Sequence, residues 1–343
     1  MAMTKRILLT GASGYLGQHL LYYWMQHAPL EDYDYKITAL YHRSEKFAQA
    51  VQTFSCRSGV TVDVKPCDLT SWDDLLESTI KVDDFDICIH AAALSSPQAC
   101  QADPNMAHAM NIPTKFFDRM VKIPMIALST DQVYDGTKDT LQSGYYLEDE
   151  DEPRPLNVYA ITKLEMEEAL RTTTKATPTA TTTQKGEKQR VAPTIILRSS
   201  IMLGPQPPLC PAHKLFLHFC KSRNHEPTTL FVNEYRTVVS VKHVCRVIDW
   251  WMVHLTQPQF QTTTNVSPQY QIYNLGGSIR VNRYDMAEAV FSHFGYDTQC
   301  LEPVLQTSPT SPLDISMDSR KLQNVTSIVH NPETLSGLVQ DTF

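Results

Sequence analysis

The sequence predicts an α/β fold, a doubly wound parallel sheet with a smaller C-terminal α/β lobe. Two observations predict it. Short apolar runs alternate with helical stretches through the first half of the chain, which is typical of parallel strands joined by helices. The first apolar run, Ile7-Leu8-Leu9, leads into a glycine-rich turn and then a helical stretch. Sheets of this kind bind phosphate at such a turn.

Composition and charge exclude several classes of protein. Of the 343 residues, 42% are hydrophobic and 20% are charged, and the net charge is −7. These values indicate a globular chain and argue against a nucleic-acid surface. No apolar run approaches the length of a membrane span, and no signal peptide is evident. The eight cysteines form no C-x-x-C, so we expect reduced thiols, no metal site and a cytoplasmic location.

The first turn has the spacing G-x-x-G-x-x-G, a variant of the dinucleotide-binding fingerprint. A helix expected over 18–26 follows it. The unpaired N–H groups at the start of a helix attract a pyrophosphate, and glycines let the backbone approach it closely. The residues predicted to bind the cofactor here are Gly11, Ser13, Gly14, Tyr15, Leu16 and Gly17.

Four further strands continue the predicted sheet. They are expected over 35–41, 60–64, 85–90 and 125–129, with a long helix over 106–121. A sixth strand is expected over 194–198, delayed by a Thr-rich insertion at 172–190. That insertion has few apolar residues and no hydrophobic period, so we expect it to be flexible or disordered.

The strand ends indicate which dinucleotide binds. Arg43 follows the second strand where an acid would favour NAD, and a guanidinium there can grip a ribose phosphate. The sequence therefore favours NADP(H), the alternative being that Arg43 merely starts a solvated helix. Asp68 and Leu69 follow the third strand, and Asp68 is placed to accept from the adenine amino group. The small residues Ala91, Ala92 and Ala93 follow the fourth and leave room for the cofactor.

A catalytic set follows the fifth strand. Thr130 lies at its end, and Tyr159 and Lys163 occur at i and i+4 of a predicted helix, so both project from one face. A tyrosine hydroxyl has an ordinary pKa of roughly 10, and we expect the lysine ammonium to lower it. Tyr159 would then be the acid, Lys163 its tuner and a ribose ligand, and Thr130 the group that holds the substrate oxygen.

Beyond residue 198 the pattern is mixed. Helices are expected over 215–221, 243–255 and 283–294, with strands over 238–241 and 272–275 and a polar loop insertion over 261–269. We therefore predict a Rossmann-type NAD(P)-binding domain over 1–198, to which part of 236–276 returns. The remainder, 199–343, would be mainly a substrate-binding lobe.

The motifs GASGYLG, STDQVYDG, PLNVYAITK and LRSSIMLGP, with the segment after Tyr273, resemble the extended short-chain dehydrogenase/reductase superfamily. Within it, roughly residues 4–325 resemble the dTDP-4-dehydrorhamnose reductase group, which also contains the regulatory β subunit of methionine adenosyltransferase. The resemblance implies an NAD(P)-binding lobe, a nucleotide-sugar substrate and the catalytic set Thr130, Tyr159 and Lys163.

Three functions remain open. The first is an NADPH-dependent reductase of a 4-keto-6-deoxy nucleotide sugar, with Arg198 and Arg236 nearest the substrate or, equally, in structural salt bridges. The second is a nucleotide-sugar epimerase that retains NAD. The third is an NADP-binding regulatory subunit with methionine adenosyltransferase as partner; a homodimer is a further option. Dehydratases of the superfamily carry Thr-Asp-Glu, and the neutral Gln132 cannot act as that acid.

Overall fold

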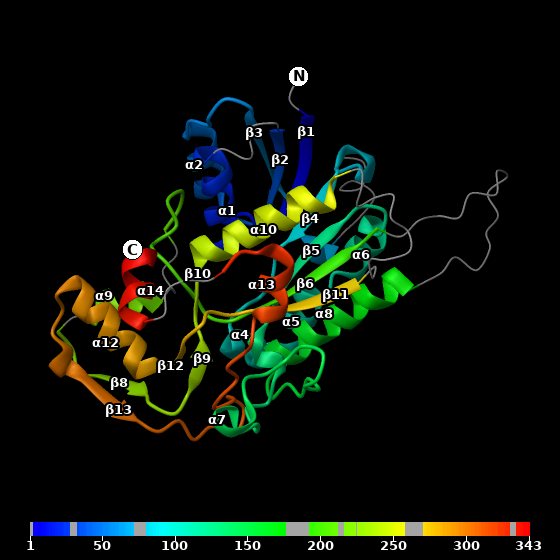
Figure 1. Ribbon diagram of the computed structural model, residues 1–343. Helices are drawn as coiled ribbons and strands as arrows, with labels where there is room; N and C mark the ends of the chain where they lie inside the picture. Colours follow the sequence, from blue (N-terminus) through cyan, green and yellow to red (C-terminus); the bar gives the residue numbers. More distant parts are fainter. Residues whose placement is uncertain are drawn as a thin grey trace.

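A parallel sheet is the centre of the molecule (Figure 1). The computed structural model describes residues 3–27, 33–71, 80–175, 192–211, 216–223, 225–257, 270–329 and 334–343. Within these residues, seven strands pair in the order β11-β6-β5-β4-β1-β2-β3, and every pairing in this sheet is parallel. The order reverses between β1 and β4, so the ligand crevice is expected at their carboxyl ends. The predicted doubly wound sheet is confirmed.

The strands of this sheet are β1 Met3–Thr10, β2 Tyr33–Tyr41, β3 Val60–Pro66, β4 Ile87–His90, β5 Met125–Thr130, β6 Thr194–Ser199 and β11 Tyr270–Leu275. The helices that cover it are α1 Tyr15–Gln26, α2 Glu45–Thr53, α4 Pro97–Ala102, α5 Pro104–Asn111, α6 Thr114–Met120, α8 Val158–Lys175, α10 Val241–Leu255 and α13 Arg320–Thr326. Short 3-10 turns follow two strands, η1 Leu69–Ser71 and η3 Asp131–Val133.

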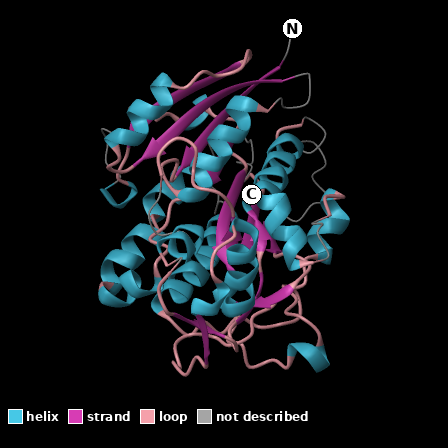
Figure 2. Ribbon diagram, turned by 90° about the vertical axis from the view of Figure 1, so that its left-hand side faces the viewer, coloured by secondary structure: helices cyan, strands magenta, loops and turns pink. Residues whose placement is uncertain are grey.

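Helices cover both faces of the sheet, as Figure 2 shows. Successive side chains of a strand point to opposite faces. Ile7 and Leu9 of β1 accordingly join one core cluster with α1, α2, α10 and α13, while Leu8 joins the other with α6 and α8. Burial on both faces explains why these strands read as continuous apolar runs.

The second lobe has its own core, made chiefly by α12 Arg283–Phe294, α14 Leu335–Thr342 and nearby short strands. Its remaining elements are β7 Met202–Leu203, α9 Phe216–Ser222, β8 Thr228–Phe231, β9 Tyr235–Thr237, β10 Val239–Ser240, β12 Arg280–Asn282 and β13 Leu301–Val304, and α7 Thr140–Ser143 lies in the loop after β5. This lobe packs below the carboxyl end of the sheet in Figure 1, so the two together flank the crevice.

Two expectations about single elements need correction. The long helix over 106–121 is two helices, α5 and α6, because Pro113 precedes α6 and disfavours helical backbone in the residue before it. The Thr-rich insertion begins later than predicted, since α8 remains helical to Lys175. Its residues 176–190 and the patch 261–269 lie outside the described residues. The boundary between the two domains stays a prediction.

No helix in the described part of the chain combines the length and the apolar character needed to cross a bilayer.

Candidate functional site

The glycine turn after β1 packs against the backbone that follows β4, at the edge where the ligand crevice is expected. Gly11 has a φ of +69°, and a Cβ added to it would lie 2.6 Å from the backbone nitrogen of Ala92. A Cβ on Gly17 would lie 2.3 Å from the carbonyl oxygen of Gly11. Both positions therefore require glycine. The turn brings the predicted phosphate residues and the alanines after β4 together.

The start of α1 is available to an anion. Gly14 is its N-cap, and no side chain caps the helix. First-turn N–H groups without a cap suit a phosphate, so the cradle fits a dinucleotide. Ser13 accepts from Gln18 through its carbonyl oxygen at 2.8 Å. Leu16 is buried, and Tyr15 packs edge-on against His19. Tyr15 and Leu16 therefore hold the turn by packing.

The adenosine end of the crevice contains charges of both signs. Arg43 is exposed, and its Nε donates to His42 Nε2 at 3.1 Å. The same His42 atom lies 3.4 Å from Asp68 Oδ2. Burial opposes ionisation of Asp68, but hydrogen bonds from Thr70 and the nearby His42 outweigh it and lower the pKa. Arg43 and Asp68 thus lie on either side of His42. The sequence had indicated only the positive charge of Arg43 at the position expected for the phosphate.

The catalytic set converges at the end of β5. Thr130 is the last residue of that strand, and its hydroxyl donates to Asp131 Oδ1 at 3.2 Å and lies near enough to Tyr159 to affect the pKa of that residue. Asn157 caps the helix that carries Tyr159, accepting from the Ala160 N–H at 3.0 Å. The Tyr159 ring is half-buried. Thr130, Tyr159 and Lys163, which the sequence separates, therefore share one face of the crevice.

Burial controls the two titrating groups of this set. It raises the pKa of Tyr159 to about 12, although Thr130 acts in the opposite direction. It lowers the pKa of Lys163 to about 8. The Lys163 ammonium donates to Met166 Sδ at 3.1 Å. The pKa of Tyr159 is therefore raised and not lowered as expected, and the group that acts against burial is Thr130 and not Lys163.

Two buried residues complete this face and were missed by sequence reasoning. Asn111 accepts from the Leu94 N–H at 2.7 Å and donates to Thr162 Oγ1 at 2.9 Å, so it joins the loop after β4 to α8. His90 shares a hydrogen bond of 2.9 Å with Thr10 Oγ1 through its Nδ1. Its Nε2 has no partner within the described residues. A polar residue inside an apolar stretch was the available signal for both.

Arg198 is not open to a substrate. It is 2% exposed, and Glu167 and Tyr134 take its guanidinium. Its Nη2 lies 2.7 Å from Glu167 Oε2. A buried charge needs such a partner, so Arg198 is a structural residue here, and its prediction as a substrate contact is corrected.

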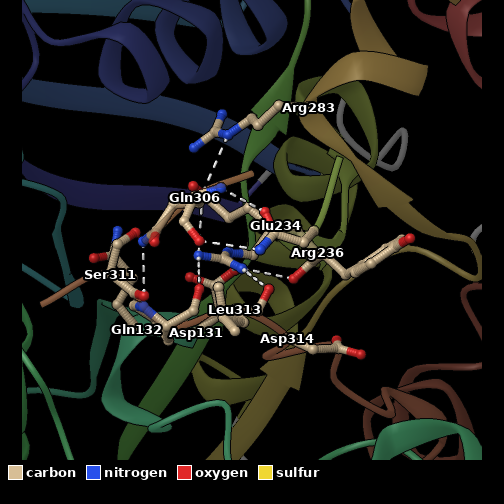
Figure 3. A network of polar contacts seen from close by, with 12 residues as sticks. Asp131, Gln132, Glu234, Arg236, Arg283, Gln306, Ser311, Leu313 and Asp314 are labelled. Carbon is tan, nitrogen blue, oxygen red and sulfur yellow. Dashed lines mark hydrogen bonds and ion pairs between the residues drawn. The ribbon is translucent and has the colours of Figure 1, made fainter. Parts of the chain in front are cut away.

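Arg236 is likewise engaged by the protein, in the network of Figure 3. It donates to the carbonyl oxygens of Pro312 at 3.0 Å and Leu313 at 3.2 Å, and to Glu234 Oε1 at 3.2 Å. Its Nε lies 3.9 Å from Asp131 Oδ2. Arg236 therefore braces the segment that follows Thr130, and a direct substrate contact is not supported.

Asp131 and Gln132 are also held in place. Burial raises the pKa of Asp131, which accepts from Ser200 Oγ at 2.8 Å and lies beside Thr130. Gln132 Oε1 accepts from Asn157 Nδ2 at 3.0 Å, and the same amide donates to the Thr310 carbonyl at 3.1 Å. The loop 305–314 is thereby fastened to the start of the catalytic helix.

Comparison with known proteins shows the family and the fold of the chain. The model of the RmlD substrate binding domain family matches residues 5–334. A probable low-salt glycan biosynthesis reductase, Agl14 of Haloferax volcanii, is 30% identical over 169 residues, which are 48% of each protein. The chain thus matches about half the length of that curated relative.

Solved structures share the fold. A dTDP-4-dehydrorhamnose reductase from Bacillus anthracis in complex with NADP has a TM-score of 0.67 at 16% identity, covering 98% of both chains. A UDP-glucuronic acid 4-epimerase from Bacillus cereus in complex with UDP-glucuronic acid and NAD has a TM-score of 0.71 at 20% identity, covering 98% of this chain and 97% of that one. At these identities the likeness is one of fold.

Proposed function

The chain belongs to the RmlD substrate binding domain family, and on that premise we propose that it reduces a 4-keto-6-deoxy nucleotide sugar with NADPH. Membership confirms the predicted superfamily, the extended short-chain dehydrogenases/reductases, and makes the chain an NAD(P)-dependent oxidoreductase. The substrate class and the choice of NADPH are the proposal.

One observation carries the proposal. The hydroxyl of Tyr159 lies near enough to that of Thr130 for Thr130 to affect its pKa, and Lys163 lies one helical turn further along α8. Because β1, β4 and β5 are parallel neighbours in one sheet, this set and the glycine turn follow strand ends at the same edge of the sheet. A carbonyl oxygen placed between the two hydroxyls would receive hydrogen bonds from both.

These residues would divide the work as follows. Thr130 positions the sugar carbonyl oxygen, and Tyr159 Oη donates a proton to that oxygen as it becomes an alkoxide. The raised pKa of Tyr159 keeps the hydroxyl protonated at neutral pH. The Lys163 ammonium has three N–H donors and gives one of them to the sulfur of Met166, a weak acceptor, so its other N–H groups would suit ribose hydroxyls.

The cofactor would lie across the switch point between β1 and β4. Gly11, Gly14 and Gly17 would cradle the pyrophosphate, the alanines after β4 would flank the nicotinamide half, and Arg43 would bind the 2′-phosphate. When bound, NADPH supplies the hydride. Asp68 beside His42 opposes that phosphate, so Arg43 must offset its charge.

The test is a turnover assay. Purified protein is offered NADPH and a small panel of 4-keto-6-deoxy nucleotide sugars, and loss of NADPH absorbance is followed. We expect oxidation with at least one sugar. We expect Tyr159→Phe to lower kcat by roughly a hundredfold or more while still binding NADPH, because only the proton donor is lost.

Two results would contradict the proposal. Firmly held NAD in the purified protein would indicate an epimerase. Stoichiometric recovery with methionine adenosyltransferase from its own cell extract, without oxidation of NADPH by any sugar of the panel, would indicate a regulatory subunit.

A further inference from the structure

Three residues of α8 line up on one helical face. Tyr159, Lys163 and Glu167 are spaced by four residues, which places each one turn from the next. The sequence analysis used the first two. Glu167 is 2% exposed, a depth at which a carboxylate occurs only with strong partners.

Glu167 is bound by the two strands that flank the catalytic set. Ser129 Oγ of β5 donates to Glu167 Oε1 at 2.5 Å. Arg198 of β6 donates from Nε to Oε1 at 3.1 Å and from Nη2 to Oε2 at 2.7 Å, a two-pronged contact. Since Ser129 directly precedes Thr130, Glu167 fixes α8 against the residue that lies near Tyr159.

The same contacts reach further into the sheet. The other prong of Arg198, Nη1, donates to the Tyr134 hydroxyl at 3.0 Å. That hydroxyl donates to Asn274 Oδ1 of β11, also at 3.0 Å. The carboxylate of Glu167 therefore fixes the position of α8 relative to β5, β6 and β11.

Glu167 also lies one helical turn from Lys163, near enough for its charge to act on the buried ammonium. The titratable groups around Lys163 are His90 from β4 and Tyr159 and Glu167 from α8. Burial keeps His90 neutral by lowering its pKa to about 3, and Tyr159 is a neutral phenol at neutral pH. Glu167 is the anion among them, and its charge opposes the loss of the lysine proton.

We infer that Glu167 is a positioning residue of the active site: it locks the catalytic helix to the end of β5 and holds Lys163 as a buried cation. The catalytic meaning of this rests on the proposed function. The placement of Glu167 and its charge beside Lys163 do not, so they can be tested without turnover.

The first test is a double-mutant cycle in unfolding free energy, which reports the pKa of Lys163 in the folded chain. Because the pKa of Lys163 is lowered from 10.5 to about 8 in the folded chain, the unfolded chain binds more protons between these values. The stability of the wild type relative to Lys163→Met must then rise with pH across that window. In the Glu167→Gln background we expect the rise to begin about one pH unit lower.

Glu168→Gln is the matched control. Glu168 is the next residue of α8 and also pairs with an arginine, Arg171, but both side chains are largely exposed. We expect this variant to leave the window unmoved. The inference would be overturned if the stability rose over the same pH range in Glu167→Gln and in the wild type. A carboxylate with a purely structural role would change the stability without shifting that pH range.

A second arm guards against misfolding. Should Glu167→Gln not fold, Glu167→Gln/Arg198→Met replaces it, since this pair leaves no lone buried charge. The rise in stability should then begin at a lower pH than in the wild type. A rise that begins at the same pH would contradict the inference.

The catalytic arm uses kcat/KM with NADPH and an active sugar. Glu167→Gln should lower kcat at least tenfold and move the basic limb of the pH profile downward, and Glu167→Asp should restore the limb. A wild type without turnover would refute the proposed function and leave the folding cycle as the decisive measurement for Glu167.

Discussion

The two arginines that are buried among the described residues, Arg198 and Arg236, perform different tasks with the same chemistry. Arg198 forms a close two-pronged pair with one carboxylate, and its partners all lie on elements of the sheet or on α8 and the loop after β5. Arg236 shares two carboxylates at longer range, 3.2 Å from Glu234 and 3.9 Å from Asp131, and spends other N–H groups on backbone carbonyls. Arg198 fixes α8 against the sheet, whereas Arg236 holds together segments that are far apart in the chain.

The difference teaches that burial alone does not tell which arginine is indispensable. What counts is whether its carboxylate keeps another partner when the arginine is removed. Among the hydrogen bonds of the described residues, the Glu167 carboxylate would retain the one from the Ser129 hydroxyl. Glu234 would retain Arg283 at 3.3 Å, and Asp131 would retain Ser200 at 2.8 Å. The predictions below test this ranking, from the largest effect to the smallest.

Arg198→Met should have the largest effect. It leaves the Glu167 carboxylate buried without the cation that hydrogen-bonds it, which costs about 3 to 5 kcal/mol of unfolding free energy. Urea denaturation followed by circular dichroism measures this loss. A loss of roughly 1 kcal/mol or less, the range of exposed pairs, would remove the distinction between the two networks.

Arg236→Met should cost less stability, about 2 kcal/mol, because both carboxylates keep other partners. It should nevertheless reduce kcat, since Asp131 follows Thr130 directly and the loop 305–314 loses its contacts with the guanidinium. Unfolding and turnover measured on the same preparation check both parts. Stability loss equal to that of Arg198→Met would contradict the ranking.

Arg43→Asp tests an exposed arginine at the proposed cofactor phosphate. We expect NADPH binding to weaken by about 2 kcal/mol, roughly thirtyfold, from the lost pair and added repulsion. NADH binding should change little, because NADH lacks that phosphate. Fluorescence titration with both nucleotides is the measurement. Equal binding of both by the wild type, with a silent variant, would refute the NADP(H) assignment.

Arg171→Ala should have the smallest effect. Its pair with Glu168 is exposed and lies within one helix, so we expect a change below about 0.5 kcal/mol in unfolding free energy. A thermal unfolding series in rising salt measures it. A larger loss that salt does not reduce would show that the end of α8 depends on this pair.

The sheet could be predicted because its signals are local. The apolar runs of β1 to β6 and the turn at Gly11 each act within a few residues, and their positions agree with the structure. The short strands of the second lobe were largely missed. Their pairing partners lie far apart in the chain, as with β8 and β13, and a strand of four residues has no clear period.

The site could be predicted only in part, for the same physical reason. Tyr159 and Lys163 share a helix, so their spacing reveals their common face. The roles of Arg198 and Arg236 depend on Glu167, Glu234 and carbonyl groups of distant segments. A sequence shows that an arginine is present, but not whether its guanidinium pairs with a carboxylate or is exposed to solvent.

The fastening of Arg236 has a consequence for the order of synthesis. A ribosome adds Arg236 to the chain 76 residues before Pro312 and 77 before Leu313, the two residues whose carbonyl groups it binds. The strands β1 to β6 and the whole catalytic trio precede it. The nucleotide cradle can therefore be complete in a nascent chain in which Arg236 still lacks these two contacts, and the contacts can form only after the loop 305–314 has left the exit tunnel.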